Sequence, residues 1–174
     1  QAYLPVERDA IAALIDRIAA AGYRHLVATA DVPVGGNREN LVRAGYTSPL
    51  RPTLKLALDA AAHPRWLFGT ALRTLRNHGM PYYENSSVER GMAVFSNAAT
   101  RAHLRDSLSW PDLEWIRERW QGKLIVKGIL SPSDAQTVRQ IGCDGVIVSN
   151  HGGRQLDGAT APLRALPRIA EVAQ

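Results

Sequence analysis

The sequence contains one cysteine, Cys143, so the chain cannot form an internal disulfide bond. A single thiol fits a protein that stays in a reducing compartment. Cys143 lies between Gly142 and Asp144, where we expect a turn leading into a strand. No neighbouring feature marks this thiol as a nucleophile, so its expected role is the packing of a small side chain.

Long apolar runs are missing as well. A membrane-spanning helix needs about 18 or more consecutive apolar residues, and the most apolar segment, 10–21, is interrupted by Asp16 and Arg17. The sequence also lacks a signal-peptide pattern. We therefore expect a chain that does not span a membrane, in a protein that is cytoplasmic, with a peripheral place at the inner face of the membrane as an alternative.

Several motifs that define function classes are absent. The sequence has no HxxxH, no paired cysteines and few neighbouring acids, so no metal site is expected. It has no GxSxG or Walker loop, so Ser149 is not expected to act as a nucleophile. Basic residues are not interleaved with aromatic ones, so no nucleic acid is expected, although the net charge of +5 favours anionic partners of some kind.

The remaining composition is that of an ordinary globular domain. The chain has 174 residues, 45% of them hydrophobic and 21% charged. It opens on Gln1, and residues 1–5 have the pattern of a strand that is already ending. We interpret the sequence as one piece of a longer protein.

Strands and helices are expected to alternate through most of the chain. Apolar runs predict strands over 25–30, 124–128 and 145–149, and a further strand is expected to end near Tyr3. Helices are expected from about residue 7 to Gly22, from Ser109, from an N-cap at Ser131, and over 162–173. Strands separated by helices pair in parallel, so their carboxyl ends should face one way.

The segment 37–109 interrupts this alternation. Helical pieces are expected around 53–62 and 66–76, separated by His63-Pro64. Residues 37–79 hold seven Lys or Arg and two Asp or Glu, an excess of five that equals the net charge of the chain. Insertions of this length are usually functional or mobile.

Polar residues of chemical interest follow the expected strands. Asp31 follows the first, Lys127 ends the second, and the loop 149–155 follows the third with His151 and Arg154. The carboxyl ends of parallel strands are where ligands bind. Paired arginines grip a carboxylate, a histidine can remove a proton, and a carboxylate beside it stabilises the imidazolium. The structural alternatives are a helix-capping Asp31, a snorkelling Lys127, a satisfied loop histidine and a surface arginine.

These residues carry a family resemblance. The segments SNHGGRQLD (149–157), LIVKGI (124–129), TAD (29–31) and the opening Gln-Ala-Tyr resemble the FMN-dependent 2-hydroxy acid oxidases and dehydrogenases, a family that includes glycolate oxidase, flavin-type L-lactate dehydrogenase and mandelate dehydrogenase. The resemblance runs through 1–174, loosely between 44 and 107. It implies an α/β fold, a (β/α)8 TIM barrel, present here as a partial barrel from the end of strand 3 to strand 6 with a long basic insertion, 37–109, after strand 4.

The resemblance also implies a role for individual residues. His151 is similar to the base that takes the substrate proton, and Asp31 to its partner carboxylate. Arg38 and Arg154 resemble the pair that binds the substrate carboxylate, and Tyr3 the phenol that hydrogen-bonds the substrate. The implied FMN-contacting positions are Gln1, Tyr3, Thr29, Lys127 and Ser149, with Lys127 near the pyrimidine edge of the isoalloxazine. Together these roles imply oxidation of an L-2-hydroxy acid, similar to lactate or mandelate, to the 2-oxo acid.

The segment His63-Pro64-Arg65-Trp66 resembles the membrane-associated lactate and mandelate dehydrogenases. This favours a quinone or another carrier over oxygen as electron acceptor, and a peripheral membrane contact through 37–79; the alternative is a solvated loop that steers anionic substrate. For the full-length protein the family implies a homo-oligomer, a tetramer. The family's usual flavin-phosphate segment is expected to lie outside this piece, so the 174 residues alone are expected to be inactive and to bind FMN weakly or not at all.

Two other functions remain open at this stage. One is a phosphate-binding barrel lyase or isomerase in which Lys127 forms a Schiff base. The other is a non-catalytic basic fragment, in which replacement of His151 has no measurable effect. The sequence leaves open which 2-hydroxy acid is used.

Overall fold

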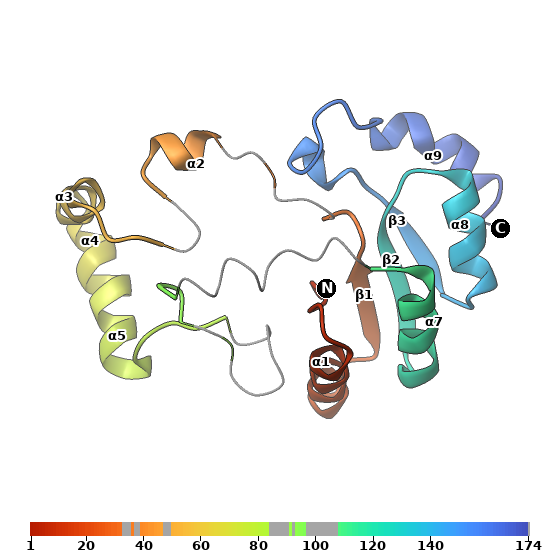
Figure 1. The fold of residues 1–174 in the computed structure, drawn as a ribbon, viewed down its shortest axis with the longest axis horizontal. Helices are drawn as coiled ribbons and strands as arrows, with labels where there is room; N and C mark the ends of the chain where they lie inside the picture. Colours follow the sequence, from red (N-terminus) through yellow and green to blue (C-terminus); the bar gives the residue numbers. More distant parts are fainter. Residues whose placement is uncertain are drawn as a thin grey trace. The chain divides into compact units, whose positions relative to one another are not determined.

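The computed structural model describes residues 1–32, 36, 39–46, 50–83, 91, 93–96 and 108–173. The chain divides into two compact units (Figure 1). One comprises Gln1–Asn37 and Leu104–Gln174, and we call it the sheet unit. The other, Arg38–His103, we call the helical unit.

The sheet unit is built on three parallel strands. These are β1 (His25–Thr29), β2 (Lys123–Ile129) and β3 (Gly145–Val148), hydrogen-bonded in the order β1-β2-β3. At the other side of β1, Ala2 forms an isolated parallel bridge with Ala28. The N–H of Ala2 donates to the Val27 oxygen over 2.8 Å, and the Ala2 oxygen accepts from the N–H of Thr29 over 3.1 Å. The expected strand near Tyr3 is therefore present as a single bridge.

In the described part of the sheet unit, four helices accompany the strands. They are α1 (Arg8–Ala20), α7 (Trp110–Arg119), α8 (Pro132–Gln140) and α9 (Pro162–Ala170). Each has the apolar spacing of an amphipathic helix, so its buried residues fall on one side. In Figure 1, α8 and α9 lie beside β3, and both contact this strand.

The core lies on the helix-covered face of the sheet. Leu26 and Ala28 of β1 and Leu124 and Val126 of β2 alternate with outward residues, and each is at most 1% exposed. They pack with apolar residues of all four helices, namely Ile11, Ile15, Ile116, Val138 and Ile169. Burial of each such large aliphatic side chain stabilises the fold by about 1.5–3 kcal/mol.

The opposite face of the sheet is less covered and carries the chemistry. In the strand register Thr29 is paired with Lys127, and Lys127 with Ile147. Ile147 is 40% exposed, whereas Thr29 is 7% exposed. Residues two apart share a face, so Thr29 and Lys127 both point away from the helix-packed core.

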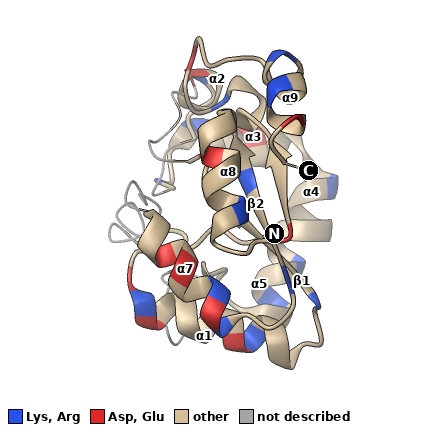
Figure 2. Cartoon of the chain, turned by 90° about the vertical axis from the view of Figure 1, so that its right-hand side faces the viewer, with Lys and Arg blue, Asp and Glu red and all other residues tan. Residues whose placement is uncertain are grey.

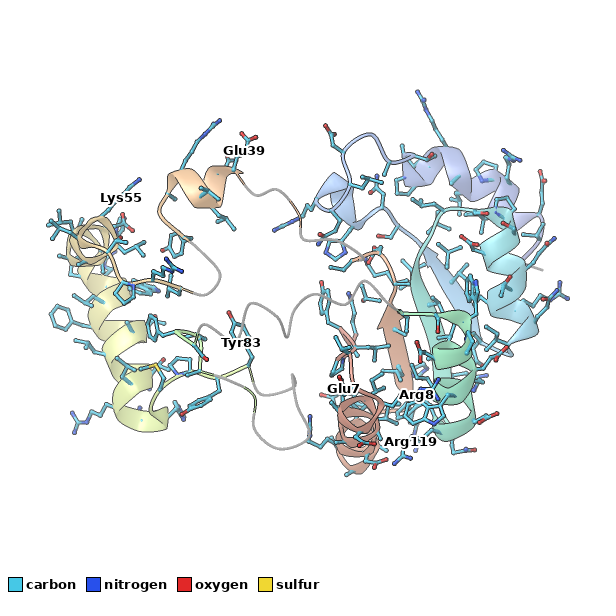
Figure 3. The ribbon with its side chains drawn as sticks, in the orientation of Figure 1. Glu7, Arg8, Glu39, Lys55, Tyr83 and Arg119 are labelled. Atoms are coloured by element: carbon cyan, nitrogen blue, oxygen red, sulfur yellow. The ribbon has the colours of Figure 1, made fainter. Side chains whose placement is uncertain are left out.

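Charged residues of both signs interleave on the outer surfaces of α1 and α7 (Figure 2). Two ion pairs connect these helices: Arg8 with Asp112 at 3.1 Å and Arg119 with Asp16 at 2.7 Å. Arg8 and Arg119 are labelled in Figure 3. Exposed pairs of this kind each contribute at most about 1 kcal/mol, so the helices are held chiefly by their apolar faces.

The helical unit contains α2 (Glu39–Arg43), α3 (Leu54–Ala62), α4 (Pro64–Trp66), a π-helical segment (Leu67–Leu72) and α5 (Arg73–His78). The Oγ1 of Thr53 caps α3 by accepting from the Leu56 N–H over 3.3 Å. His63 separates α3 from the following helical stretch, which begins directly at Pro64 because proline is tolerated in a first helical turn. Tyr82 and Ala93 form an antiparallel bridge.

Several expected boundaries were wrong by a few residues. Strand β2 continues past Lys127 to Ile129, and α9 ends at Ala170 rather than at residue 173. Ser131 holds the N-cap position of α8, but its hydroxyl makes no capping bond and lies 2.6 Å from the hydroxyl of Ser133. A capping rule based on sequence does not take such competition from a neighbouring side chain into account. Across the described part of the chain, no helix is long and apolar enough to cross a bilayer.

Candidate active site

The residues that follow the three strands meet at the carboxyl end of the sheet. Asp31 lies two residues beyond β1, Lys127 lies inside β2, and Ser149 and His151 directly follow β3. Their side chains are mostly buried: the exposed fractions are 6% for Asp31, 16% for Lys127 and 13% for His151. Parallel pairing thus brings together groups that are up to 120 residues apart in the chain.

The carboxylate of Asp31 is the centre of this cluster. Its Oδ2 accepts from the Lys127 ammonium at 2.5 Å and from the Ser149 hydroxyl at 2.9 Å. Its Oδ1 lies 2.9 Å from Nδ1 of His151. Because both of its oxygens are engaged in this way, the buried Asp31 carboxylate is fixed in position.

Burial alone raises the pKa of the Asp31 carboxyl, because it removes water from the charged form. Hydrogen bonds from Lys127, His151 and Ser149, with the positive charge of Lys127, outweigh burial and hold this pKa below its ordinary value of 3.8. Asp31 is therefore an anion at neutral pH.

The anion determines which nitrogen of His151 is available. A carboxylate can only accept, so Nδ1 of the neutral imidazole carries the proton that faces Asp31. The lone pair then resides on Nε2. When Nε2 takes a proton, the Asp31 charge stabilises the imidazolium, which is the arrangement of a general base with its partner carboxylate.

His151 is held in an unusual backbone conformation. Its φ is 58°, and it is the one non-glycine residue with a positive φ among those that the structure describes. Left-handed conformations cost a side-chain-bearing residue about 1–2 kcal/mol. Gly152 and Gly153 follow with φ of 68° and 69°, so His151–Gly153 form a short turn in which all three residues have positive φ. The glycines let the chain turn at once and aim the imidazole back at β1.

Gly128 makes the approach of Asp31 possible. The pairing of β2 with β3 shifts register between Lys127 and Ile129, which is a β-bulge centred on Gly128 with φ of 111°. A Cβ at this position would lie 2.5 Å from the Cβ of Asp31 and 2.7 Å from its backbone nitrogen. Glycine is therefore required for the chain after β1 to pass against β2.

Two further predicted residues border the cluster. The ring of Tyr3 lies edge-on to the imidazole of His151, with 6.1 Å between centroids and 64° between planes, and Tyr3 is 58% exposed. The Nε2 of Gln1 donates to the hydroxyl of Thr29, a buried residue of β1, over 2.9 Å. Both therefore lie at the same end of the sheet as Asp31 and Lys127.

Of the two arginines that were predicted to bind the substrate, Arg154 lies among the described residues and Arg38 does not. Arg154 directly follows the turn His151–Gly153 and is exposed. A Cβ at Gly36 would collide with the backbone oxygen of Arg154, so the chain after β1 runs closely against the loop after β3. The Oε1 of Gln155 is buried there and has no hydrogen-bond partner among the residues that the structure describes.

Sequence reasoning missed three features of the site. It did not foresee the ion pair between Lys127 and Asp31, the hydroxyl bond from Ser149 to Asp31, or the need for glycine at positions 36 and 128. A glycine inside a strand pattern is the signal that could have found the bulge. The pairing of Lys127 with Asp31 depends on strand register, which a sequence does not display. In the described ranges, no group of three or more His, Cys, Asp or Glu could hold a metal ion.

The fold and the site together define a class of protein. It is a parallel α/β protein with a buried histidine–carboxylate–lysine cluster at the ends of its strands. Over residues 1–174 the chain matches the family described as FMN-dependent dehydrogenase. The chain belongs to this family.

Relatives and solved structures agree with this assignment. An L-lactate dehydrogenase of Xanthomonas campestris pv. campestris (strain B100) is 41% identical over 175 residues, which is 98% of this chain and 44% of that protein. A putative L-lactate dehydrogenase of Mycobacterium tuberculosis (strain ATCC 25618 / H37Rv) is 41% identical over 171 residues, 98% of this chain and 39% of the relative. The chain thus spans less than half the length of these relatives.

Among solved structures, the monotopic membrane protein (S)-mandelate dehydrogenase superposes with a TM-score of 0.80 at 35% identity, covering 96% of this chain and 44% of that one. A mandelate oxidase superposes with a TM-score of 0.60 at 27% identity, covering 98% and 39%. The predicted family and the α/β class with a parallel sheet are confirmed.

Proposed function

We propose that the full-length protein oxidises an L-2-hydroxy acid to the 2-oxo acid with FMN, and that His151 is the base. The observation that carries this proposal is the 2.9 Å contact between His151 Nδ1 and the buried anion Asp31, which leaves Nε2 free to accept a proton. The names of the relatives, L-lactate dehydrogenase and (S)-mandelate dehydrogenase, point to the same substrate class.

The chain's own residues fit a flavin at this end of the sheet. Thr29 and Lys127 are register partners on the face away from the core, and Gln1 is hydrogen-bonded to Thr29. A hydroxyl, an amide and an ammonium are a donor set suited to the polar edge of an isoalloxazine ring. We infer that Gln1, Tyr3, Thr29, Lys127 and Ser149 hold FMN, which when bound supplies the two-electron acceptor for the oxidation.

The remaining residues bind the substrate and move its proton. Arg154, together with Arg38, binds the substrate carboxylate through paired hydrogen bonds. Tyr3, beside the imidazole, hydrogen-bonds the substrate from the exposed side. Nε2 of His151 takes the proton, and Asp31 stabilises the resulting imidazolium. The low exposure of His151 and Asp31 strengthens this interaction because little water screens it.

The finer fold that we propose is a (β/α)8 barrel. The single bridge at Ala2 and the strands β1, β2 and β3 are parallel neighbours in chain order, as a barrel requires. They correspond to strands 3 to 6, with the segment 37–109 inserted after strand 4. The partly exposed face with Ile147 is then the inside of the barrel.

A Schiff-base function for Lys127 is disfavoured by its surroundings. Its Nζ lies 2.5 Å from the Asp31 carboxylate, and the Lys127 side chain is 16% exposed. Lys127 would have to leave this ion pair before its nitrogen could attack a carbonyl. Borohydride treatment with a carbonyl substrate should therefore leave the lysine unmodified.

The experiment for the main proposal is anaerobic mixing of the flavin-loaded full-length protein with L- and D-lactate, L- and D-mandelate and glycolate. We expect the L-acids to bleach the flavin absorbance and the D-acids to leave it unchanged. Equal bleaching by both enantiomers, or none by any 2-hydroxy acid, would contradict the proposed function.

We further propose that the helical unit makes a peripheral membrane contact. Phe68, Leu72 and Leu75 are spaced four and three residues apart, so they share one side of the helical stretch, and they are 66%, 45% and 44% exposed. No residue from 60 to 83 is acidic. Side chains project outward along α3 to α5 in Figure 3.

Basic residues flank this apolar side. Arg65, Arg73 and Arg76 lie on the same stretch, where their charges can meet anionic head groups while the apolar side chains enter the interface. A membrane place favours a quinone or other carrier as electron acceptor over oxygen. The similarity to the monotopic membrane protein (S)-mandelate dehydrogenase supports this choice.

The membrane proposal is tested by sedimentation of the full-length protein with vesicles of phosphatidylglycerol and phosphatidylcholine. We expect binding that weakens with salt and that Phe68→Ser with Leu72→Ser reduces at every salt concentration. Leu163→Ser is the control, because Leu163 of α9 is also exposed, at 82%, but lies in the sheet unit. Binding unaffected by the double change, or equally reduced by the control, would contradict a contact through this helix.

A further inference from the structure

The hydroxyl of Ser149 connects the two groups on which proton removal depends. It donates to Asp31 Oδ2 over 2.9 Å, and it accepts from the backbone N–H of His151 over 3.0 Å. Its one hydrogen and one of its lone pairs are thereby used inside the cluster. No other described side chain binds both Asp31 and the backbone of His151.

Each of these two hydrogen bonds restrains a group that could otherwise move: the backbone of His151 or the carboxylate of Asp31. The backbone of His151 has the left-handed φ of 58°, which is unfavourable for a residue with a side chain, and the bond to its N–H holds it there. The Asp31 carboxylate could rotate about its side-chain torsions, and the bond to Oδ2 fixes the plane from which Oδ1 meets Nδ1. One small side chain therefore sets both partners of the histidine–aspartate pair.

We propose that Ser149 is a positioning residue that sets the orientation of His151 relative to Asp31. This inference rests on the proposed function for its kinetic consequences, but not for its structural ones. It differs from the expected flavin contact of Ser149, since a hydroxyl committed to Asp31 and His151 has only one lone pair left for a cofactor. Loss of the hydroxyl misdirects the imidazole while the binding residues Gln1, Thr29 and Arg154 remain.

Loss of the Ser149 hydroxyl should change kcat much more than KM. Removing a hydrogen bond to a charged group corresponds to roughly a 10- to 100-fold change in an equilibrium or rate. In the full-length protein Ser149→Ala should lower kcat per bound flavin by this factor, with KM changed less than about twofold. Ser149→Thr, which keeps the hydroxyl, should recover most of the loss, and Ser149→Cys, a close match in size but a weak donor, should lie between.

A second readout does not depend on turnover. Hydrogen–deuterium exchange of the peptide covering residues 149–155 should be faster in Ser149→Ala than in wild type, because the His151 N–H loses its acceptor, and slow again in Ser149→Thr. The measurement is made with and without FMN, so it stands even if the protein oxidises no hydroxy acid. Ser133→Ala is the matched control, since Ser133 is exposed in the first turn of α8.

The outcomes separate the two levels of the argument. Faster exchange with a lower kcat, both restored by threonine, supports the positioning role. Unchanged exchange and kcat in Ser149→Ala overturn it, as does a loss of flavin occupancy with normal kcat per flavin, which would make Ser149 a cofactor ligand only. If wild type lacks hydroxy acid activity but the exchange behaves as described, the proposed function fails and the structural role of Ser149 stands. Should Ser149→Ala not fold, Ser149→Cys and Ser149→Thr decide the question by the same two measurements.

Discussion

Replacement of Gly128 by alanine tests whether the geometry around Asp31 controls the site. The new Cβ would lie 2.5 Å from the Cβ of Asp31 and 2.7 Å from its nitrogen, where ordinary carbon contacts are about 3.5–4.0 Å. Asp31 or the bulge must therefore move by about 1 Å. In addition, φ at this position is 111°, a conformation that alanine rarely adopts.

The expected magnitude has two parts. The unfavourable backbone conformation costs about 1–2 kcal/mol, and overpacking against backbone costs about 1–3 kcal/mol more. The free energy of unfolding should thus fall by about 2–5 kcal/mol. A displacement of about 1 Å at a reacting geometry lowers the rate by about 100-fold, so kcat per bound flavin should fall by at least that factor.

Gly142→Ala is the matched control. Gly142 also has a positive φ, 84°, but nothing lies within 4 Å of its added Cβ. It should show only the backbone cost, about 1–2 kcal/mol, with a normal kcat. Urea unfolding and steady-state kinetics of both variants measure the difference. If Gly128→Ala matched Gly142→Ala in stability and kept wild-type kcat, the close approach of β2 to Asp31 would have no functional importance.

Two other predictions concern titrating groups. Hydrogen bonds from Lys123 and from the Leu124 N–H lower the pKa of Asp144 to about 2. The stabilising contribution of Asp144 is therefore complete above its ordinary pKa of 3.8 and is lost as the pH falls through about 2. In an acid titration followed by circular dichroism, Asp144→Asn should flatten the loss of stability across this range, and an unchanged profile would contradict the prediction. Burial raises the pKa of the Cys143 thiol to about 11, so alkylation of the folded protein by iodoacetamide at pH 8 should be much slower than that of the unfolded chain, and equal rates would contradict the buried position.

Much of the sheet unit could be predicted from its sequence because local patterns decide it. The apolar spacing of α1 and the runs at β1, β2 and β3 each specify one element, and parallel pairing follows from the helices between them. The expected meeting of Asp31, Lys127 and His151 at one end of the sheet depended only on this topology. Their roles in catalysis remain predictions.

The details of the site could not be predicted because they depend on register and close contact. The pairing of Lys127 with Asp31 depends on the register of β1 and β2, and Gly128 must lack a side chain because Asp31 passes against it. The proposed role of Ser149 depends on a backbone conformation at His151 that no propensity favours. These are tertiary constraints, and they override local preference at functional sites.

The most direct test of the central claim is single-turnover reduction of the flavin in His151→Gln. Wild-type and variant full-length proteins, with equal FMN content, are mixed anaerobically with L-lactate or L-mandelate, and the rate of flavin bleaching is followed. Glutamine keeps the size and polarity of the side chain but cannot act as the base. We predict a rate at least 100-fold lower in the variant, within the range that general-base catalysis contributes, with substrate binding retained. Bleaching at the wild-type rate would contradict the assignment of His151 as the base.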